Sequence, residues 1–218
     1  MILSLTEENY IKIIYTLVAQ NEEKGASTND IAELSQTKPS SVTDMLKKLS
    51  EKQLISYRKY KSVSLTVEGS LQALRIIRKH RLWEVFLHET LQFSWDKVHE
   101  VAEQLEHIQS AELIEKLDAF LGFPGFDPHG DPIPNAKGDF RVQKKIFLAK
   151  VKAGKTCKIV AVKDSSSTFL QYLQKLNIGI GTRIKVLEKM DFDESILIQT
   201  PDQQITVSKK FADNLYVN

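Results

Sequence analysis

Between residues 80 and 107 this chain repeats histidine and glutamate at intervals of one helical turn. The repeating residues are His80 and Glu84 in RKHRLWE, followed by His99, Glu103, Glu106 and His107 in HEVAEQLEH. Side chains four positions apart stack on one face of an α-helix, and at about 3.6 residues per turn Glu106 falls within the same arc. We therefore expect two neighbouring helices, the second with an apolar back to bury and a front of imidazoles and carboxylates.

This pattern has two interpretations. One is a solvated acidic face with two surface histidines. Such a face usually has Lys or Arg three or four positions away, yet Glu103 and Glu106 have only His, Glu, Gln, Ala and Ser at those offsets. The two carboxylates then repel each other without compensation, and a divalent cation would remove the repulsion. Because imidazole and carboxylate without thiolate suit Mn, Fe, Co or Zn, we favour a metal site.

Composition excludes several classes of protein. The chain has 218 residues, of which 42% are hydrophobic and 27% charged, as is usual for globular proteins. No apolar run approaches the roughly 18 residues of a membrane-spanning helix, and no basic segment leads into an apolar one at the start, so we expect neither a membrane span nor a signal peptide. Cys157 is the only cysteine, which excludes an intramolecular disulfide and fits a reducing cytoplasm.

Charge divides the chain into three parts. Residues 1–81 contain 13 Lys/Arg against 9 Asp/Glu, residues 82–140 contain 3 against 12, and residues 141–218 contain 14 against 7. The balances of +4, −9 and +7 predict a basic nucleic-acid module, an acidic cation-binding module and a third basic piece.

Residues 27–49 have the pattern of a helix-turn-helix. A first short helix begins after the capping sequence at Ser27, and a second begins at Pro39, a residue that suits a first helical turn. The second helix opens with hydroxyl side chains that can reach base edges or phosphates in a major groove. Two alternating runs at 54–59 and 62–66 predict a hairpin after it, hence a wing.

DNA binding is the interpretation we favour for this module. Between residues 47 and 61 there are six basic residues and one acid, which suits contacts with phosphates. The alternative is the Lys-rich surface of an ordinary helical bundle, since helix-turn-helix shapes also occur without DNA. The candidate contact residues are Thr28, Thr37, Lys38, Pro39, Ser40, Ser41, Thr43, Asp44, Lys47, Lys48, Lys59 and Lys61.

The remaining segments complete a three-part chain. A long helix starts at Thr66, another follows Phe93, and a third spans Ser110–Leu121. These helices carry more apolar residues than so small a module can bury in its own core, which predicts that the surplus forms a dimer interface. Residues 122–138 are rich in Pro and Gly and read as a loop in which His129 is exposed and has no assigned role. After residue 145, strand-like runs surround one helix at 168–176, predicting a small β-barrel.

Together these segments resemble the diphtheria-toxin-repressor family of metal-dependent transcriptional repressors over nearly the whole chain. The stretches that carry the resemblance are TEENYIKIIY, KPSSVTDMLKKL, RKHRLWE, KVHEVAEQLEH, DPHGDPIP and the C-terminal VKAGKTCKIVAV and FLQYLQKLNIGIGTRIKV. It implies a mainly α protein with a winged helix-turn-helix at 1–72, a helical dimerisation and metal-binding domain at 73–137, and an SH3-like domain at 145–218 that is also similar to a ferrous-transport accessory fold.

The resemblance also implies two metal sites. One corresponds to His80, Glu84 and His99. The other corresponds to Glu103, Glu106 and His107, with Asn9 contributed by the first helix. Asp164 stands near the position from which the C-terminal domain contributes in iron-type members, which makes it a candidate ancillary ligand.

Three positions bear on which metal is bound. Iron-responsive members have Cys where this chain has Glu103, and the manganese branch has an acid, which favours Mn(II) over Fe(II). Asn9 replaces the Met or Asp of the family but still offers a carbonyl oxygen. Lys12 stands where the manganese branch is acidic, and it cannot ligate while charged.

We therefore expect a cytoplasmic homodimer that binds palindromic double-stranded operator DNA when Mn(II) or Fe(II) occupies up to two sites per subunit. Zn(II) or Co(II) should substitute in vitro. We expect no enzymatic activity, no small organic substrate and no membrane association. The alternatives are a metal-independent winged-helix regulator and a di-metal hydrolase, which would need a coordination position open to water and a general base.

Overall fold

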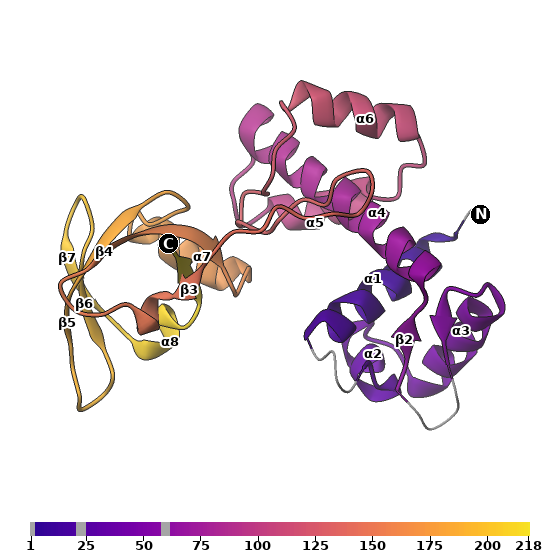
Figure 1. Cartoon of the computed structure of the whole chain (residues 1–218), viewed down its shortest axis with the longest axis horizontal. Helices are drawn as coiled ribbons and strands as arrows, with labels where there is room; N and C mark the ends of the chain where they lie inside the picture. The colour runs from indigo at the N-terminus through magenta and orange to yellow at the C-terminus, as the bar shows by residue number, and fades with distance from the viewer. Residues whose placement is uncertain (1–2, 21–24, 58–61) are drawn as a thin grey trace. The chain divides into compact units, whose positions relative to one another are not determined.

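The structure is a computed structural model that describes residues 3–20, 25–57 and 62–218 (Figure 1). The chain forms two compact units. The first comprises Met1–His80, Glu103–Ile114 and Pro134–Phe140, and the second comprises Arg81–Ala102, Glu115–Ile133 and Arg141–Asn218. Each unit is thus assembled from three separate stretches of sequence. The division into three consecutive domains at 1–72, 73–137 and 145–218 stays a prediction.

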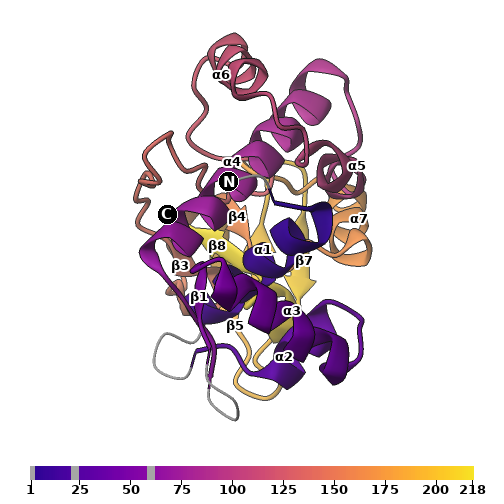
Figure 2. The ribbon, with the colours of Figure 1, turned by 90° about the vertical axis from the view of Figure 1, so that its right-hand side faces the viewer.

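The first unit contains the predicted helix-turn-helix and wing. Its elements are α1 (Leu5–Gln20), α2 (Thr28–Leu34), α3 (Pro39–Glu51), β1 (Ile55–Ser56), β2 (Ser64–Leu65) and the start of α4 (Val67–Val85). Figures 1 and 2 show α1, α2 and α3 grouped beside the hairpin strands. The strands pair antiparallel, Ile55 opposite Leu65. The candidate DNA contacts Lys59 and Lys61 lie outside the described residues.

Local chemistry explains where α2 and α3 begin. The Oγ atom of Ser27 accepts from the Asp30 backbone N–H at 3.1 Å, and the Asp30 carboxylate accepts from the Ser27 N–H at 3.4 Å, which completes a reciprocal cap. Pro39 occupies the first turn of α3, where its missing N–H needs no partner. The predicted starts of both helices are confirmed.

The core of this unit joins one face of each helix. Fully buried side chains are Ile11 and Ile14 from α1, Ile31 from α2, and Leu46 and Leu49 from α3. Leu54 and Val63 close the same cluster from the two sides of the hairpin. Burying these aliphatic groups stabilises the unit through removal of apolar area from water, and it fixes the outward face of α3.

The helices after the wing differ in one respect from prediction. A π-helical turn at Phe86–Thr90 extends α4, and α5 (Val98–Leu105) and α6 (Ala111–Phe120) follow. The expectation that Glu106 and His107 continue the α5 helix is wrong, because α5 ends at Leu105 and both lie in the turn after it. The turn carries Glu106 to full burial instead of leaving it on a helix front.

The C-terminal residues form an antiparallel sheet in the order β3-β8-β4-β5-β6-β7. The elements are β3 (Ile146–Phe147), a 3₁₀ turn (Leu148–Lys150), β4 (Thr156–Val162), α7 (Ser167–Lys175), β5 (Arg183–Lys189), β6 (Ile196–Gln199), β7 (Gln204–Val207), α8 (Lys209–Ala212) and β8 (Leu215–Val217). The small β domain and the single longer helix expected from the sequence are confirmed. The short β3, β8 and α8 were not predicted, since none is long enough to show a period.

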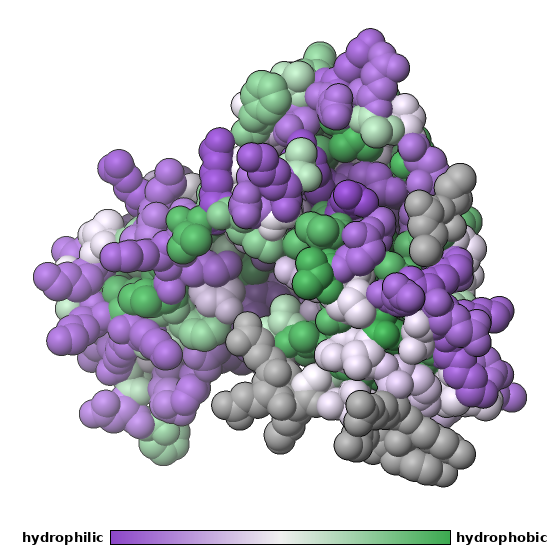
Figure 3. Space-filling model, turned by 45° about the vertical axis from the view of Figure 1, so that its right-hand side comes forward, coloured by the Kyte–Doolittle hydropathy of each residue, from purple (hydrophilic) through white to green (hydrophobic). Residues whose placement is uncertain are grey.

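The surface is mixed. On the face drawn in Figure 3, hydrophilic side chains predominate and hydrophobic ones lie among them in small groups. Among the described residues, none of the helices has the length and apolar character needed to cross a membrane.

Candidate metal centre

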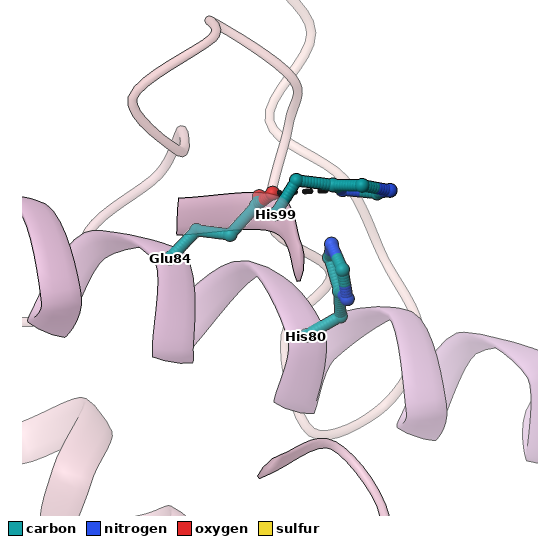
Figure 4. Close-up of side chains that lie close together, drawn as sticks. All are labelled: His80, Glu84 and His99. Carbon is teal, nitrogen blue, oxygen red and sulfur yellow. Dashed lines mark hydrogen bonds and ion pairs between the residues drawn. The ribbon is translucent and has the colours of Figure 1, made fainter. Parts of the chain in front are cut away.

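His80, Glu84 and His99 come together, as the family resemblance implies; helical spacing by itself predicted only that His80 and Glu84 share a face. His80 and Glu84 project from successive turns of α4, and His99 comes from α5 (Figure 4). His99 Nδ1 donates to Glu84 Oε1 at 3.2 Å. The three side chains offer two imidazole nitrogens and a carboxylate oxygen within 4.8 Å of one another. This donor set is one that first-row divalent cations accept.

Glu84 belongs to a second group of ligand-type side chains, with Asp127 and His129. Their donor atoms also lie within 4.8 Å of one another, and all three residues are buried. The expectation that His129 is exposed is wrong, because it is 3% exposed and its Nε2 donates to the Trp95 carbonyl at 3.1 Å. Sequence reasoning missed both residues. The available signal was the histidine between two aspartates in DPHGD, but this segment has no helical periodicity that would group them with Glu84.

Burial changes the protonation of this second group. Desolvation, reinforced by the nearby charges of Glu84 and Asp131, raises the pKa of Asp127 well above its ordinary value. Desolvation also lowers the pKa of His129, which favours the neutral imidazole that ligates metals. Arg81 lies 3.5 Å from Asp127 Oδ2 and partly offsets the negative charge. A cation bound here would offset negative charge that Arg81 offsets only in part.

Glu106 is the centre of a separate set of contacts within the first unit. It is 0% exposed, and His80 Nδ1 donates to its Oε2 at 2.6 Å. Lys12 Nζ donates to its Oε1 at 2.6 Å and lies 3.5 Å from Glu103 Oε1. The expectation that Glu103 and Glu106 are uncompensated is therefore wrong. The compensating charge comes from α1, 91 and 94 residues earlier in the chain, beyond the reach of any local spacing rule.

A second contact ties α1 to the same turn. Glu8 is 5% exposed, and its Oε2 accepts from His107 Nδ1 at 2.6 Å while its Oε1 accepts from Gln109 Nε2 at 2.8 Å. Asn9, the residue implied by the family resemblance, is exposed. Sequence reasoning missed Glu8, although an acid one position before Asn9 was a visible signal. We call Glu8, Lys12, His80, Glu103, Glu106 and His107 the α1–α5 cluster.

The electrostatics of this cluster follow from burial and pairing. Desolvation alone would raise the pKa of Glu106, but the hydrogen bond from His80 and the charge of Lys12 outweigh it and hold the pKa below its ordinary value. Burial lowers the pKa of Lys79, which the charges of Glu8 and Glu106 oppose. Glu106 is consequently ionised, and an ionised carboxylate is the form that binds a cation.

The candidate DNA-contact residues form an outward face on α2, α3 and the turn between them. Thr28 and Thr43 are partly buried, and the exposed ones are Thr37, Lys38, Pro39, Ser40, Ser41, Asp44, Lys47 and Lys48. Some are engaged within the chain, since Lys47 Nζ lies 3.1 Å from Asp44 Oδ1 and Thr37 Oγ1 is 3.0 Å from Tyr10 Oη. The hydroxyl-bearing Ser40 and Ser41 in the first turn of α3 are exposed, and their contact with DNA stays a prediction.

Asp164 is not a member of either group of ligand-type side chains found among the described residues. Its Oδ1 accepts from the Ser166 backbone N–H at 2.9 Å, just before α7. The C-terminal domain instead contacts the segment before α5, where Gln171 Nε2 donates to Asp96 Oδ2 at 2.8 Å. A role for Asp164 as an ancillary ligand stays a prediction.

A winged helix-turn-helix that carries carboxylate–imidazole clusters defines the class of metal-responsive DNA-binding proteins. Three family models match: the iron dependent repressor N-terminal DNA binding domain at residues 2–63, the iron dependent repressor metal binding and dimerisation domain at 66–135, and the FeoA domain at 146–218. The chain belongs to the iron-dependent repressor family, also called the diphtheria-toxin-repressor family, in its manganese-regulator-like branch with a C-terminal FeoA domain.

Individual relatives agree with this assignment. The chain is 34% identical to an uncharacterised HTH-type transcriptional regulator of Methanocaldococcus jannaschii over 55% of this chain and 94% of that protein. It is 36% identical to the HTH-type transcriptional regulator MntR of Bacillus pumilus over 53% of this chain and 78% of that protein. A solved manganese-dependent transcriptional repressor in complex with manganese matches with a TM-score of 0.86 and 33% identity, covering 97% and 99% of the two chains.

Proposed function

We propose that this protein is a homodimeric transcriptional repressor that binds palindromic operator DNA when it holds a divalent metal, Mn(II) more readily than Fe(II), and that it controls metal-ion homeostasis in the cytoplasm without enzymatic activity. The observation that carries the proposal is the α1–α5 cluster, because it attaches the first helix of the DNA-binding module to side chains of ligand type. The similarity to a solved manganese-dependent transcriptional repressor supports the choice of metal.

Carboxylate and imidazole side chains are donors that suit a divalent ion. Glu103, Glu106 and His107 would hold it in the α1–α5 cluster. We propose Glu8, whose carboxylate contacts His107, as the α1 ligand in preference to the exposed Asn9. His80, Glu84 and His99 would hold a second ion. A bound cation supplies concentrated positive charge with a preference for oxygen and nitrogen donors. Zn(II) and Co(II) should bind the same donors in vitro.

Residues of the chain itself couple α1 to the turn after α5. Glu8 and Lys12 lie one turn apart on α1 and reach His107 and Glu106. Contacts made more strongly in the DNA-competent state shift the population toward that state. In a dimer this would hold two recognition helices near the spacing of one DNA turn, about 34 Å. We assign the dimer interface to residues 73–137, where Phe120 is 67% and Phe123 61% exposed.

The test is Glu106→Gln, which keeps the size of the side chain and removes its charge. The probe is a DNA duplex selected from a random pool by Mn(II)-loaded wild-type protein. We expect the variant to remain a dimer and to lose the increase in affinity for this duplex that Mn(II) produces in the wild type. The matched control is Glu115→Gln, an exposed glutamate on α6, which should respond like the wild type. A normal Mn(II) response of Glu106→Gln, or a pool that yields no duplex, contradicts the proposal.

A further inference from the structure

The ammonium group of Lys12 lies between two carboxylates of the α1–α5 cluster. Its Nζ is 2.6 Å from Glu106 Oε1 and 3.5 Å from Glu103 Oε1. This is the arrangement that a cation adopts between anionic ligands. The contact is also well protected from solvent, because the side chain of Lys12 is 19% exposed and that of Glu106 is 0% exposed. Screening by water and salt is weak at such a position.

We infer that Lys12 is the internal cation of the metal-free cluster, which a divalent ion must displace, so that Lys12 sets the metal concentration at which the protein responds. The inference rests on the proposed function. It follows from the burial of Glu106, because a buried carboxylate without a partner is strongly unfavourable. Lys12 thereby stabilises the metal-free state, and every increment of that stabilisation raises the metal concentration needed to replace it.

Lys12 is suited to displacement more than to ligation. A charged ammonium has three donors and no lone pair, so it cannot coordinate an ion. Its Nζ instead donates to carboxylate oxygens of Glu103 and Glu106. The side chain is a flexible four-carbon stem, and 19% of it already reaches solvent. Lys12 can therefore leave the carboxylates for water without a movement of α1.

Displacement of Lys12 by a divalent ion changes the positive charge close to Glu103 and Glu106. With Lys12 in place, its one positive charge lies within 3.5 Å of both Glu103 and Glu106. When a divalent ion replaces it, the two carboxylates are balanced by two positive charges and the ammonium is solvated. The competing charge is the same for every divalent ion. Lys12 is thus expected to weaken binding of Mn(II), Fe(II) and Zn(II) alike at this cluster and to leave their order of affinity unchanged.

Neutral substitution of Lys12 should produce two opposite effects. In the full chain, we expect Lys12→Met to melt at a lower temperature than the wild type when both are stripped of metal, because the buried Glu106 loses the ammonium at 2.6 Å and keeps the hydrogen bond from His80. We expect the same variant to bind Mn(II) at least about tenfold more tightly, a change of roughly 1.4 kcal/mol. Free Mn(II) is measured by electron paramagnetic resonance, and melting by circular dichroism in chelator. Lys12→Gln is the second neutral variant, should Lys12→Met fold poorly.

Two further variants separate this role from a merely structural one. Lys12→Arg keeps the positive charge and should keep a Mn(II) affinity close to that of the wild type. Lys52→Met removes a lysine–glutamate contact of the same length, 2.6 Å to Glu7, in the same unit but outside the cluster. We expect Lys52→Met to lower the melting temperature and to leave Mn(II) affinity unchanged.

The outcomes distinguish this inference from the proposed function. If wild-type protein shows a Mn(II)-dependent gain in duplex binding but Lys12→Met and Lys12→Gln bind Mn(II) no more tightly than Lys52→Met, the role of Lys12 is refuted and the repressor function stands. If the neutral variants bind Mn(II) more tightly but DNA binding never responds to metal, the repressor function is refuted and the competition stands. Absence of Mn(II) binding by all forms contradicts both.

Discussion

At the scale of single residues, the family resemblance assigned His99 to the same site as His80 and Glu84. Helical spacing predicted that His80 and Glu84 share a face, because spacing is a local property that the sequence displays directly. It did not predict Lys12, whose partner Glu106 lies 94 residues away. Nor did it predict Asp127 and His129, which reach Glu84 from a loop without periodicity. Local spacing thus identified ligand types, while partners from distant segments required the fold.

Glu84 is the residue shared by both groups of ligand-type side chains, and its substitution should show this. In Glu84→Gln we expect the number of Mn(II) or Zn(II) ions bound per subunit to fall by about one, because an amide is a weaker ligand than a carboxylate. Calorimetric titration of the metal-free protein measures this number. Glu89→Gln, an exposed position on the following turn, is the control. A wild-type stoichiometry in Glu84→Gln would remove Glu84 from the metal site.

Gly69 of α4 packs closely against the backbone of Leu54, just before the hairpin. A Cβ atom at this position would lie 1.9 Å from the Leu54 carbonyl oxygen and 2.8 Å from its carbon, distances that require the backbone to move. We expect Gly69→Ala to lower the free energy of unfolding by about 1–3 kcal/mol, in the range of overpacked cores. Ser70→Ala, one position along, should change it by less than about 0.5 kcal/mol. Urea denaturation measures both, and equal effects would contradict the packing.

At the scale of elements, sequence rules succeeded where an element carries its own signals. The starts of α2 and α3 followed from Ser27 and Pro39, and the hairpin from alternation of apolar residues. They failed where tertiary contacts decide the end of an element. The helix α5 ends at Leu105, and the following turn buries Glu106 against His80 and Lys12. Neither partner is visible from the sequence of α5.

The cap of α2 gives a prediction at this scale. Ser27→Ala removes the oxygen that accepts from the Asp30 N–H, and we expect a loss of about 1 kcal/mol in the free energy of unfolding. Ser27→Asn restores an acceptor and should recover most of that loss. Chemical denaturation compares the three proteins. If Ser27→Ala and Ser27→Asn are equally unstable, the cap does not determine the start of the helix-turn-helix.

At the scale of the whole molecule, the family resemblance extended over nearly the entire chain, and the match to three consecutive family models confirms it. The charge pattern agrees with the roles of the parts, with an acidic stretch between two basic ones. The compact units nevertheless interleave segments, since residues 103–114 belong with residues 1–80. Composition along the chain cannot show such an exchange, because it depends on contacts between distant residues.

The central claim is that metal binding and operator binding stabilise the same state of the protein, and it is tested most directly by measuring each in the presence of the other. By linkage, Mn(II) must tighten binding of the selected duplex by the factor by which the duplex tightens binding of Mn(II). We predict a factor of roughly 5–150 in both directions, the usual range for coupled sites. Equal duplex affinity for metal-stripped and Mn(II)-loaded protein would contradict the account.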